Sequence, residues 1–457
     1  MALTKKIADF VENLRYDDIP ADAVELIKML FCDFLGVAMA GKNYEGPQVL
    51  RDYILEHGGA PDSSVPGYRF KTSPPLSALL CGTMGHVLDY DDAALSMSGH
   101  AAVILCPVIW ALGDKYNISG EKAIEAFLAG FEGGSVAAKY SKSGRSGPLI
   151  WHMTKALGII ASTLTAAKIM DLTSEQIRAA LGIAASSAGG LIENFGTMMK
   201  SFHAGSAAHE GIMAATLAKK GFTSNMDIIE IDRGFRRLFS SESEQQEEPF
   251  IDMLESGQWD ITSPTGGVVF KLYPSCGGTH KPIHALIYLA EKENINPDEV
   301  ESVVVKAPGW VFTIAHITEP KTGLEGKFSI EYTAALALIE RSVKMEHFTN
   351  EKLRQLEPLM KKVRREADEE TDTRGNTPCT VTVTMKDGKV FTKSAGPEER
   401  FPGNPMSWEV LLKKYRDCMA GHFSQPDIAK SEDILCRLES LDRFESLVSV
   451  FTDNPLD

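Results

Sequence analysis

Up to about residue 265, apolar positions recur at helical spacing between short polar connections, which is the pattern of a helical domain. One helix start is well marked. Thr173 and Gln176 form a capping box, and Ile177, Leu181 and Ala184 follow at helical spacing. This part of the chain is therefore predicted to be mainly α.

A further helix is predicted over residues 206–221, opened by Ser206 and closed by Gly221. One stripe along it consists only of small residues, namely Ala207, Gly211, Ala214, Ala215 and Ala218. Small side chains let a neighbouring helix approach closely, so we expect this helix to be buried in a bundle.

The pattern changes near Gly266. Residues 303–305 indicate a short strand, and residues 380–393 alternate with period two around Asp387-Gly388, which is typical of a β-hairpin. Helices are predicted over residues 328–339 and 351–370, and helical patterning returns from Trp408. We therefore expect a smaller α+β domain over residues 267–400. Residues 1–266 and 401–457 would form the helical domain.

Composition and charge narrow the class of protein. The net charge of −15 argues against nucleic-acid binding, which needs a basic face. The longest apolar run is far shorter than the roughly 20 residues that span a bilayer, and the N-terminus has no signal-peptide pattern. The seven cysteines lack CxxC spacing, which argues against disulfides, zinc knuckles and iron–sulfur clusters. We expect a cytoplasmic protein without a membrane partner.

Four histidines lie where a helix is predicted to begin: His100, His152, His203 and His280. The free N–H groups at a helix N-terminus can bind carboxylates, and the helix dipole disfavours imidazolium there. Such histidines can act as acid or base near neutral pH. Each alone is equally consistent with an ordinary capping histidine, but the four together indicate a carboxylate site.

Lys200 precedes one of these predicted helices and could bind a carboxylate or stabilise an enolate-like intermediate. The alternative is a solvated surface lysine. Residues 86–92, His-Val-Leu-Asp-Tyr-Asp-Asp, form a dense polar cluster whose carboxylates could orient histidines, bind a metal or cap a helix.

No metal or other cofactor is expected. The cluster at 86–92 lacks a second histidine at ligand spacing, and His280 with His284 lacks a third ligand nearby. Nucleotide-binding and serine-hydrolase motifs are also absent from the sequence.

Several segments resemble the MmgE/PrpD family in their order along the chain: residues 85–92, 98–107, 151–154, 200–211, 273–280 and 325–332. They span nearly the whole sequence. The family includes 2-methylcitrate dehydratase, cis-aconitate decarboxylase and iminodisuccinate epimerase. The resemblance therefore implies proton chemistry beside a carboxyl group.

The resemblance also implies a large all-helical domain, a smaller α+β lid, a homodimer and an active site between the domains. It implies roles for Asp89, His100, His152, Lys200, His280 and Tyr332. The first five are our candidate catalytic residues. Tyr332 is a candidate substrate-binding residue, together with His86, Asp92 and His203 from the segments described above.

Two departures speak against cis-aconitate decarboxylation. Ala93 stands where the decarboxylase pattern has threonine, and His100 lies in Ser-Gly-His-Ala instead of the more usual His-Pro. We therefore expect a cofactor-independent lyase, in first place a dehydratase of a hydroxylated di- or tricarboxylate. The alternatives are an epimerase or racemase at the same site, a cis-aconitate decarboxylase, and a non-catalytic carboxylate-binding protein.

Overall fold

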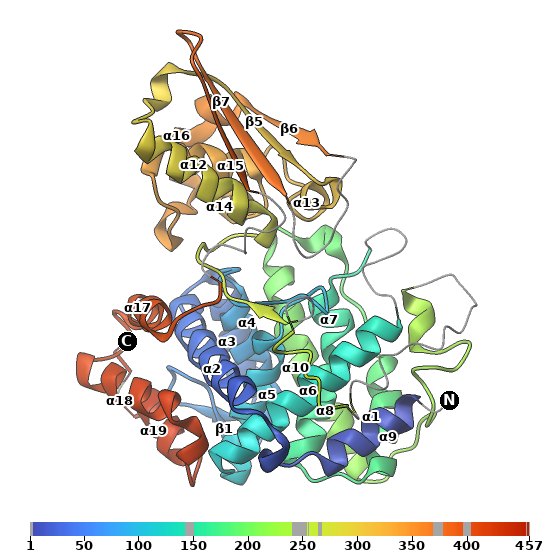
Figure 1. Ribbon diagram of the computed structural model, residues 1–457. Coiled ribbons are helices and arrows are strands. Elements are labelled where there is room, and N and C mark those ends of the chain that lie inside the picture. The colour runs from blue at the N-terminus through green and yellow to red at the C-terminus, as the bar shows by residue number, and fades with distance from the viewer. Residues whose placement is uncertain are drawn as a thin grey trace.

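The computed structural model describes residues 3–141, 150–239, 254, 256–263, 267–368, 378–395, 404–453, 455 and 456. Residues 264–266 and 396–403, where the predicted domain boundaries fall, lie outside this part of the chain. Figure 1 shows a large helical body and a smaller unit with a four-stranded sheet. The protein is mainly α, as predicted.

The helical body combines both ends of the chain. Its helices are α1 (Leu3–Asn13), α2 (Ala21–Gly41), α3 (Glu45–His57), α4 (Pro74–His86), α5 (Ala102–Tyr116), α6 (Gly120–Tyr140), α7 (Met153–Ala156), α8 (Gly158–Ile169), α9 (Ser174–Ala185), α10 (Met198–Lys219), α17 (Trp408–Met419), α18 (Gln425–Cys436) and α19 (Glu445–Thr452). One hydrophobic core joins residues between Leu3 and Phe270 with residues between Met406 and Phe451. The helices after Trp408 thus pack on the N-terminal body, where Lys414 of α17 pairs with the buried Asp33 of α2 at 2.7 Å.

Two short two-stranded sheets accompany these helices. They pair β1 (Ser63–Ser64) with β2 (Lys71–Thr72), and β3 (Ala93–Ala94) with β4 (Val268–Val269). The second pairing joins Ala93 to Val269, so it brings the segment after α4 beside the segment that leads into the small unit.

The small unit has its own core, formed by residues between Cys276 and Val383. Its elements are α12 (His280–Lys292), β5 (Val300–Ala307), α13 (Gly309–Ile314), α14 (Gly323–Gly326), α15 (Ile330–Glu340), α16 (Asn350–Met360), β6 (Val363–Ala367), β7 (Cys379–Met385) and β8 (Val390–Ala395). The sheet order is β6-β5-β7-β8, with β5 and β6 parallel and the other neighbours antiparallel. Whether this unit acts as a lid stays a prediction.

The predicted strand at 303–305 and the hairpin around Gly388 are confirmed as β5 and as β7 with β8. The predicted helix over residues 351–370 is wrong beyond Met360, because the chain turns there into strand β6. Val363 enters the core of the small unit, while Arg364 to Glu366 are partly or fully exposed. Charged residues on an edge strand prevent unwanted pairing with other strands. In the sequence, these charges have the same pattern as the solvated face of a helix, which explains the wrong prediction.

The helix predicted over residues 206–221 is present, but its predicted start is wrong. Helix α10 begins eight residues earlier, after Thr197, whose hydroxyl accepts a hydrogen bond from the N–H of Met199. Small residues of α10, Gly211 of the predicted stripe and Gly205 before it, pack closely on the neighbouring helices. A Cβ on Gly205 would lie 2.0 Å from the carbonyl oxygen of Leu79 in α4, and one on Gly211 would meet Ser162 in α8 at 2.3 Å. This contact with α4 brings the first turns of α10 to the end of α4.

None of the described helices combines the length and apolar character required to cross a lipid bilayer.

Candidate active site

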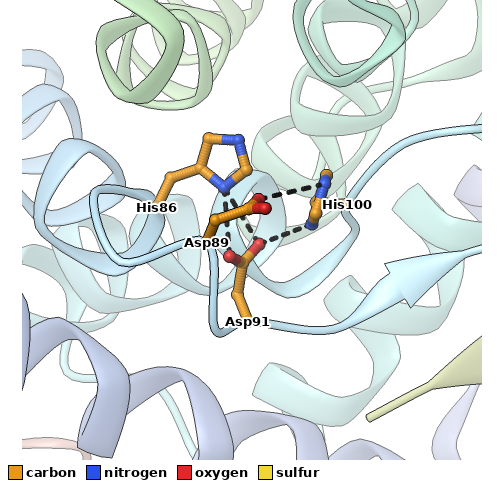
Figure 2. Close-up of side chains that lie close together, drawn as sticks. All are labelled: His86, Asp89, Asp91 and His100. Atoms are coloured by element: carbon orange, nitrogen blue, oxygen red, sulfur yellow. Dashed lines mark hydrogen bonds and ion pairs between the residues drawn. The ribbon is translucent and has the colours of Figure 1, made fainter. Parts of the chain in front are cut away.

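Helix α4 ends at His86, and the loop that follows carries three buried carboxylates. Asp91 accepts hydrogen bonds from two imidazoles, as Figure 2 shows. The His86 Nδ1 lies 3.1 Å from each of its oxygens, and the His100 Nδ1 lies 2.8 Å from Oδ2. Asp91 therefore orients both rings, although it was not among the candidate residues.

Asp92 has a different role from the predicted substrate contact. Its two oxygens accept hydrogen bonds from the N–H groups of Ala101 at 3.0 Å and Ala102 at 2.9 Å, where α5 begins. Burial and the neighbouring Asp91 raise the pKa of Asp92 to about 7, against the effect of these N–H groups. Asp92 thus supports the helix start that positions His100, whose Nδ1 lies 2.5 Å from the Asp92 carbonyl oxygen.

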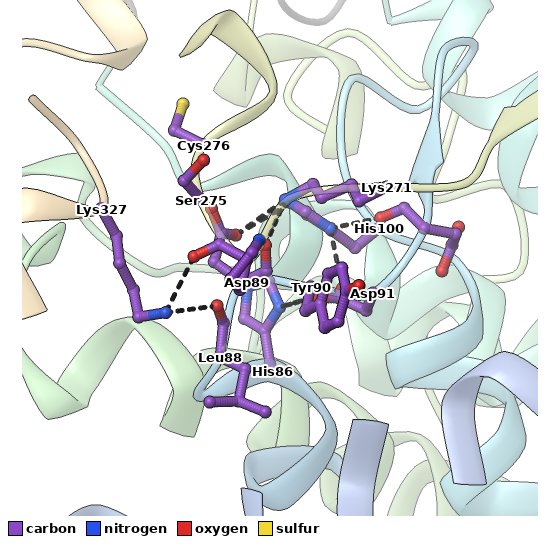
Figure 3. Close-up of polar contacts among 12 residues, drawn as sticks. His86, Leu88, Asp89, Tyr90, Asp91, His100, Lys271, Ser275, Cys276 and Lys327 are labelled. Carbon is purple, nitrogen blue, oxygen red and sulfur yellow. Dashed lines mark hydrogen bonds and ion pairs between the residues drawn. The ribbon is translucent and has the colours of Figure 1, made fainter. Parts of the chain in front are cut away.

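Asp89 lies between two lysines, in the left-handed backbone region with φ of 52°. Lys200 from α10 and Lys271 place their Nζ atoms 2.7 and 3.0 Å from Oδ1 of Asp89, and all three side chains are buried. Figure 3 shows Lys271 reaching the loop from the segment after β4. Burial acts to raise the pKa of Asp89, but Lys200 and Lys271 outweigh it and hold that pKa well below its usual value. Two ammonium groups therefore share the carboxylate of Asp89, and the buried Asp91 adds a second negative charge to the cluster.

His86 is kept neutral by this network. Lys200 donates to its Nε2 at 2.8 Å, so the ring proton is on Nδ1 and points to Asp91. Burial first, and then the charge of Lys200 against the opposing effect of Asp91, lower the pKa of His86 to about 3. A neutral imidazole in this position can accept or relay a proton but carries no charge at neutral pH.

His152 is the residue before α7, so its predicted place at a helix start is confirmed, although α7 has only four residues. Its ring stacks on that of His86 with centroids 5.6 Å apart. Burial, and then Lys200, hold the pKa of His152 well below its usual value. Its Nε2 is buried and has no hydrogen-bond partner within the described residues. An imidazole nitrogen left open beside a buried lysine is suited to meet a substrate.

His203 is not at a helix start, contrary to the prediction, because α10 begins at Met198. It lies in the second turn of α10 and places its Nδ1 3.0 Å from the Nδ1 of His152. Lys200, predicted to precede the helix, lies in its first turn. His203 therefore contacts His152 directly, on the Nδ1 side of the His152 ring.

The remaining two candidates differ in outcome. His280 is the first residue of α12, as predicted, with its Nε2 3.2 Å from the Ser275 carbonyl oxygen. Burial, and then Lys271, lower its pKa to about 3. Tyr332 lies in the core of the small unit, where its hydroxyl donates to the His347 carbonyl oxygen at 2.6 Å. The structure thus gives the Tyr332 hydroxyl a structural partner and shows no contact between it and the cluster.

Lys327 is a second buried lysine, besides Lys271, that the sequence reasoning missed. It donates to the carbonyl oxygens of Leu88 and Pro274, both at 2.8 Å, so it joins the small unit to the loop that carries Asp89 (Figure 3). Burial lowers its pKa to about 7, against the attraction of Asp89. Both lysines stand alone in apolar stretches, Val-Val-Phe-Lys-Leu and Gly-Lys-Phe, and that was the available signal.

A metal ion is a possible occupant of this cluster, since ligand atoms of His86, Asp89, Asp91 and His100 lie within 4.8 Å of one another. The donor set fits a hydrogen-bond network better. The ammonium group of Lys200 already contacts both His86 and Asp89, and a divalent cation there would be repelled by it.

Turnover is therefore expected to survive exhaustive chelation. Because two lysines supply the positive charge, removal of divalent ions should leave kcat within the error of the assay. The measurement is kcat before and after dialysis against a strong chelator. A large loss that a divalent ion restores would contradict this expectation.

Comparison with known proteins places the chain in a family. The MmgE/PrpD N-terminal domain matches residues 5–248, and the MmgE/PrpD C-terminal domain matches residues 273–439. The chain belongs to the MmgE/PrpD family. The C-terminal domain of the family thus includes α17 and α18, which pack on the helical body here.

Relatives with a described activity include three cis-aconitate decarboxylases. That of Mus musculus is 26% identical over 98% of this chain and 90% of its own length. That of Homo sapiens is 25% identical over 96% and 92%, respectively. That of Aspergillus terreus is 26% identical over 98% and 95%. The similarity therefore covers both units of the fold.

Proposed function

We propose that this MmgE/PrpD protein is a cofactor-independent lyase for a small di- or tricarboxylate, in first place a dehydratase of a hydroxylated substrate. One observation carries the proposal: neutral buried histidines surround a pair of lysines that share a single carboxylate. Cis-aconitate decarboxylases among the relatives support a lyase that acts on carboxylates.

The arrangement meets the demands of this chemistry. Removing a proton beside a carboxyl group builds negative charge on that carbon and its carboxylate. Lys200 and Lys271 offer two ammonium groups, both in contact with Asp89, for stabilising that charge. His152 offers an open Nε2 as the base. His100, with 14% of its side chain exposed, is the member of the cluster nearest to solvent.

Neutral histidines favour proton abstraction. A dehydratase or an epimerase must first accept a proton from carbon, whereas a decarboxylase must deliver one to the carbanion that remains. His86, His152 and His280 all have lowered pKa values and are unprotonated at neutral pH, and the Nε2 of His152 is open to accept a proton. Ala93 also provides no hydroxyl beside the cluster.

Decarboxylation of cis-aconitate is the second candidate, because the similarity to decarboxylases covers almost the whole chain. An epimerase needs bases on both faces of the carbon, and a silent carboxylate binder needs only the positive site. Incubation with a panel of di- and tricarboxylates in deuterated water, followed by NMR, separates these functions. We expect alkene formation from a hydroxylated substrate. Loss of carbon dioxide, deuterium uptake without net reaction, or binding without any change would each favour one alternative.

The homodimer, the cytoplasmic location and the closing of the small unit as a lid are proposals that rest on the family resemblance. Such a lid would meet the body where Lys327 contacts Leu88 and Pro274. Light scattering tests the dimer, cell fractionation tests the location, and small-angle scattering with and without substrate tests the closure.

A further inference from the structure

His152 and His203 form a directly bonded pair of imidazoles. Their Nδ1 atoms lie 3.0 Å apart, and both side chains are buried. Burial in each case lowers the pKa, to about 4 for His203 and well below its usual value for His152. Both rings are therefore neutral at neutral pH. Two neutral imidazoles at this distance share one proton, so one Nδ1 donates and the other accepts.

Gly190 holds this pair in place. Its carbonyl oxygen accepts a hydrogen bond from the backbone N–H of His152 at 2.8 Å. Its φ of 93° suits glycine, and a Cβ there would lie 3.1 Å from the Cβ of Lys155 and 3.5 Å from Cε1 of His203. Helix α10 fixes His203 from the other side. The geometry of the pair is thus set by backbone that substrate need not touch.

We propose that His203 is a positioning residue that acts through His152: it accepts the Nδ1–H of His152, leaves Nε2 of His152 bare as the base, and takes over the shared proton during the reaction. The proposal rests on the proposed function, since it needs a substrate proton to be removed. His203 itself never touches the substrate, which replaces the predicted role of His203 in substrate binding.

The substrate C–H bond breaks, its electron pair stays on the substrate, and the proton forms a bond with Nε2 of His152. The proton on Nδ1 of His152 then passes to Nδ1 of His203, which keeps its own Nε2–H. His152 ends neutral with its proton on Nε2, and the positive charge ends on His203. No further reactant is needed.

Electrostatics favours this resting place for the charge. His152 faces Lys200 and the rings of His86, His100 and His203, with no carboxylate among the groups that shift its pKa. His203 faces Lys155 and Lys200, and the charge of Lys155 is offset by Glu210, whose Oε1 lies 3.0 Å from its Nζ. An imidazolium therefore costs less at His203 than at His152, and moving it there separates it from the lysine that binds the substrate.

Two substitutions distinguish the proposed proton relay, in which His203 takes the proton from His152, from a purely orienting role of His203. His203→Asn keeps an acceptor oxygen near the position of Nδ1 but cannot take a proton, whereas His203→Leu removes both functions. The relay predicts that kcat falls by roughly 10²-fold in both variants, with a smaller change in KM. A purely orienting role predicts wild-type kcat in His203→Asn and a loss only in His203→Leu. The matched control is His209→Asn on the same helix, with wild-type kcat.

The tautomer can be measured without any substrate. In ¹⁵N-histidine NMR of the resting protein, with His152→Gln for assignment, we expect His152 protonated at Nδ1 and bare at Nε2. His203 should be protonated at Nε2. His152 protonated at Nε2 would overturn the proposal, even if the variants do not fold. If no carboxylate is turned over, the proposed function fails while this result still decides the tautomer. If the enzyme is active and His203→Asn turns over at the wild-type rate, only the relay fails.

Discussion

Replacement of Lys200 by methionine is expected to lower kcat by roughly 10²–10³, which corresponds to about 3–4 kcal/mol of lost transition-state stabilisation. The Nζ of Lys200 is buried and lies 2.7 Å from Asp89 and 2.8 Å from His86, at the centre of the cluster. Methionine keeps much of the aliphatic stem and removes the charge that opposes the developing negative charge. The measurement is kcat on the substrate identified by the panel, together with the midpoint of thermal unfolding.

The Lys200→Met variant is also expected to be less stable to heat than the wild type. A surface lysine could be replaced without effect, but Lys200 is buried, so some loss of thermal stability is expected. The loss is limited because Asp89 keeps Lys271 as a counterion at 3.0 Å. Lys168→Met is the matched control, since Lys168 is also buried in the helical body and donates to the Leu14 carbonyl oxygen. Its melting point should fall while kcat stays at the wild-type level. Wild-type kcat in Lys200→Met would place the chemistry elsewhere.

The histidines show what local pattern can predict. His100, His152 and His280 lie next to or at a helix start in the structure, because a helix begins where capping residues and backbone geometry allow it. The prediction that His203 lies at a helix start was wrong, because Thr197 and Ser206 are both suitable N-caps by residue type. Ser206 is buried inside α10, where its hydroxyl donates to the His203 carbonyl oxygen. Only packing against α4 distinguishes the two starts.

The lysine pair could not be predicted from local pattern, because it is assembled from distant parts of the chain. Lys200 is 111 residues from Asp89, and Lys271 is 182 residues away. The pairing of β3 with β4, two residues each, brings Lys271 to the loop, and such short strands carry almost no sequence signal. The substrate-binding role of Tyr332 stays a prediction. The resemblance identified its segment but not its partner, and the hydroxyl donates to His347 in the core of the small unit.

Asp89→Asn is expected to destabilise the fold by about 3–5 kcal/mol at neutral pH and to abolish most activity. The amide keeps an acceptor oxygen but leaves Lys200 and Lys271 buried without their shared counterion. Urea unfolding of the variant and the wild type measures the difference in their free energies of unfolding. Asp171→Asn is the control, because Asp171 pairs with Lys122 at 2.6 Å on the surface, where a pair contributes about 0–1 kcal/mol.

The pH dependence identifies the cause of the loss. In the wild type, burial acts to lower the pKa of Lys271, but Asp89 and then Asp91 outweigh it and raise that pKa. Its ion pair therefore stabilises the fold fully below the pKa of the unfolded chain, and this stabilisation is lost as pH rises through the folded pKa. In Asp89→Asn, only Asp91 remains to oppose burial, so we expect the pKa of Lys271 to fall below that of the unfolded chain. The unfolded state then binds more protons, and the free energy of unfolding rises with pH. From neutral pH to about pH 10, the effect in the variant narrows the difference in free energy of unfolding between the two proteins, and the wild-type loss adds to it only at higher pH. If the difference in free energy of unfolding stays constant over this pH range, the loss of stability in Asp89→Asn arises from packing and not from uncompensated charge.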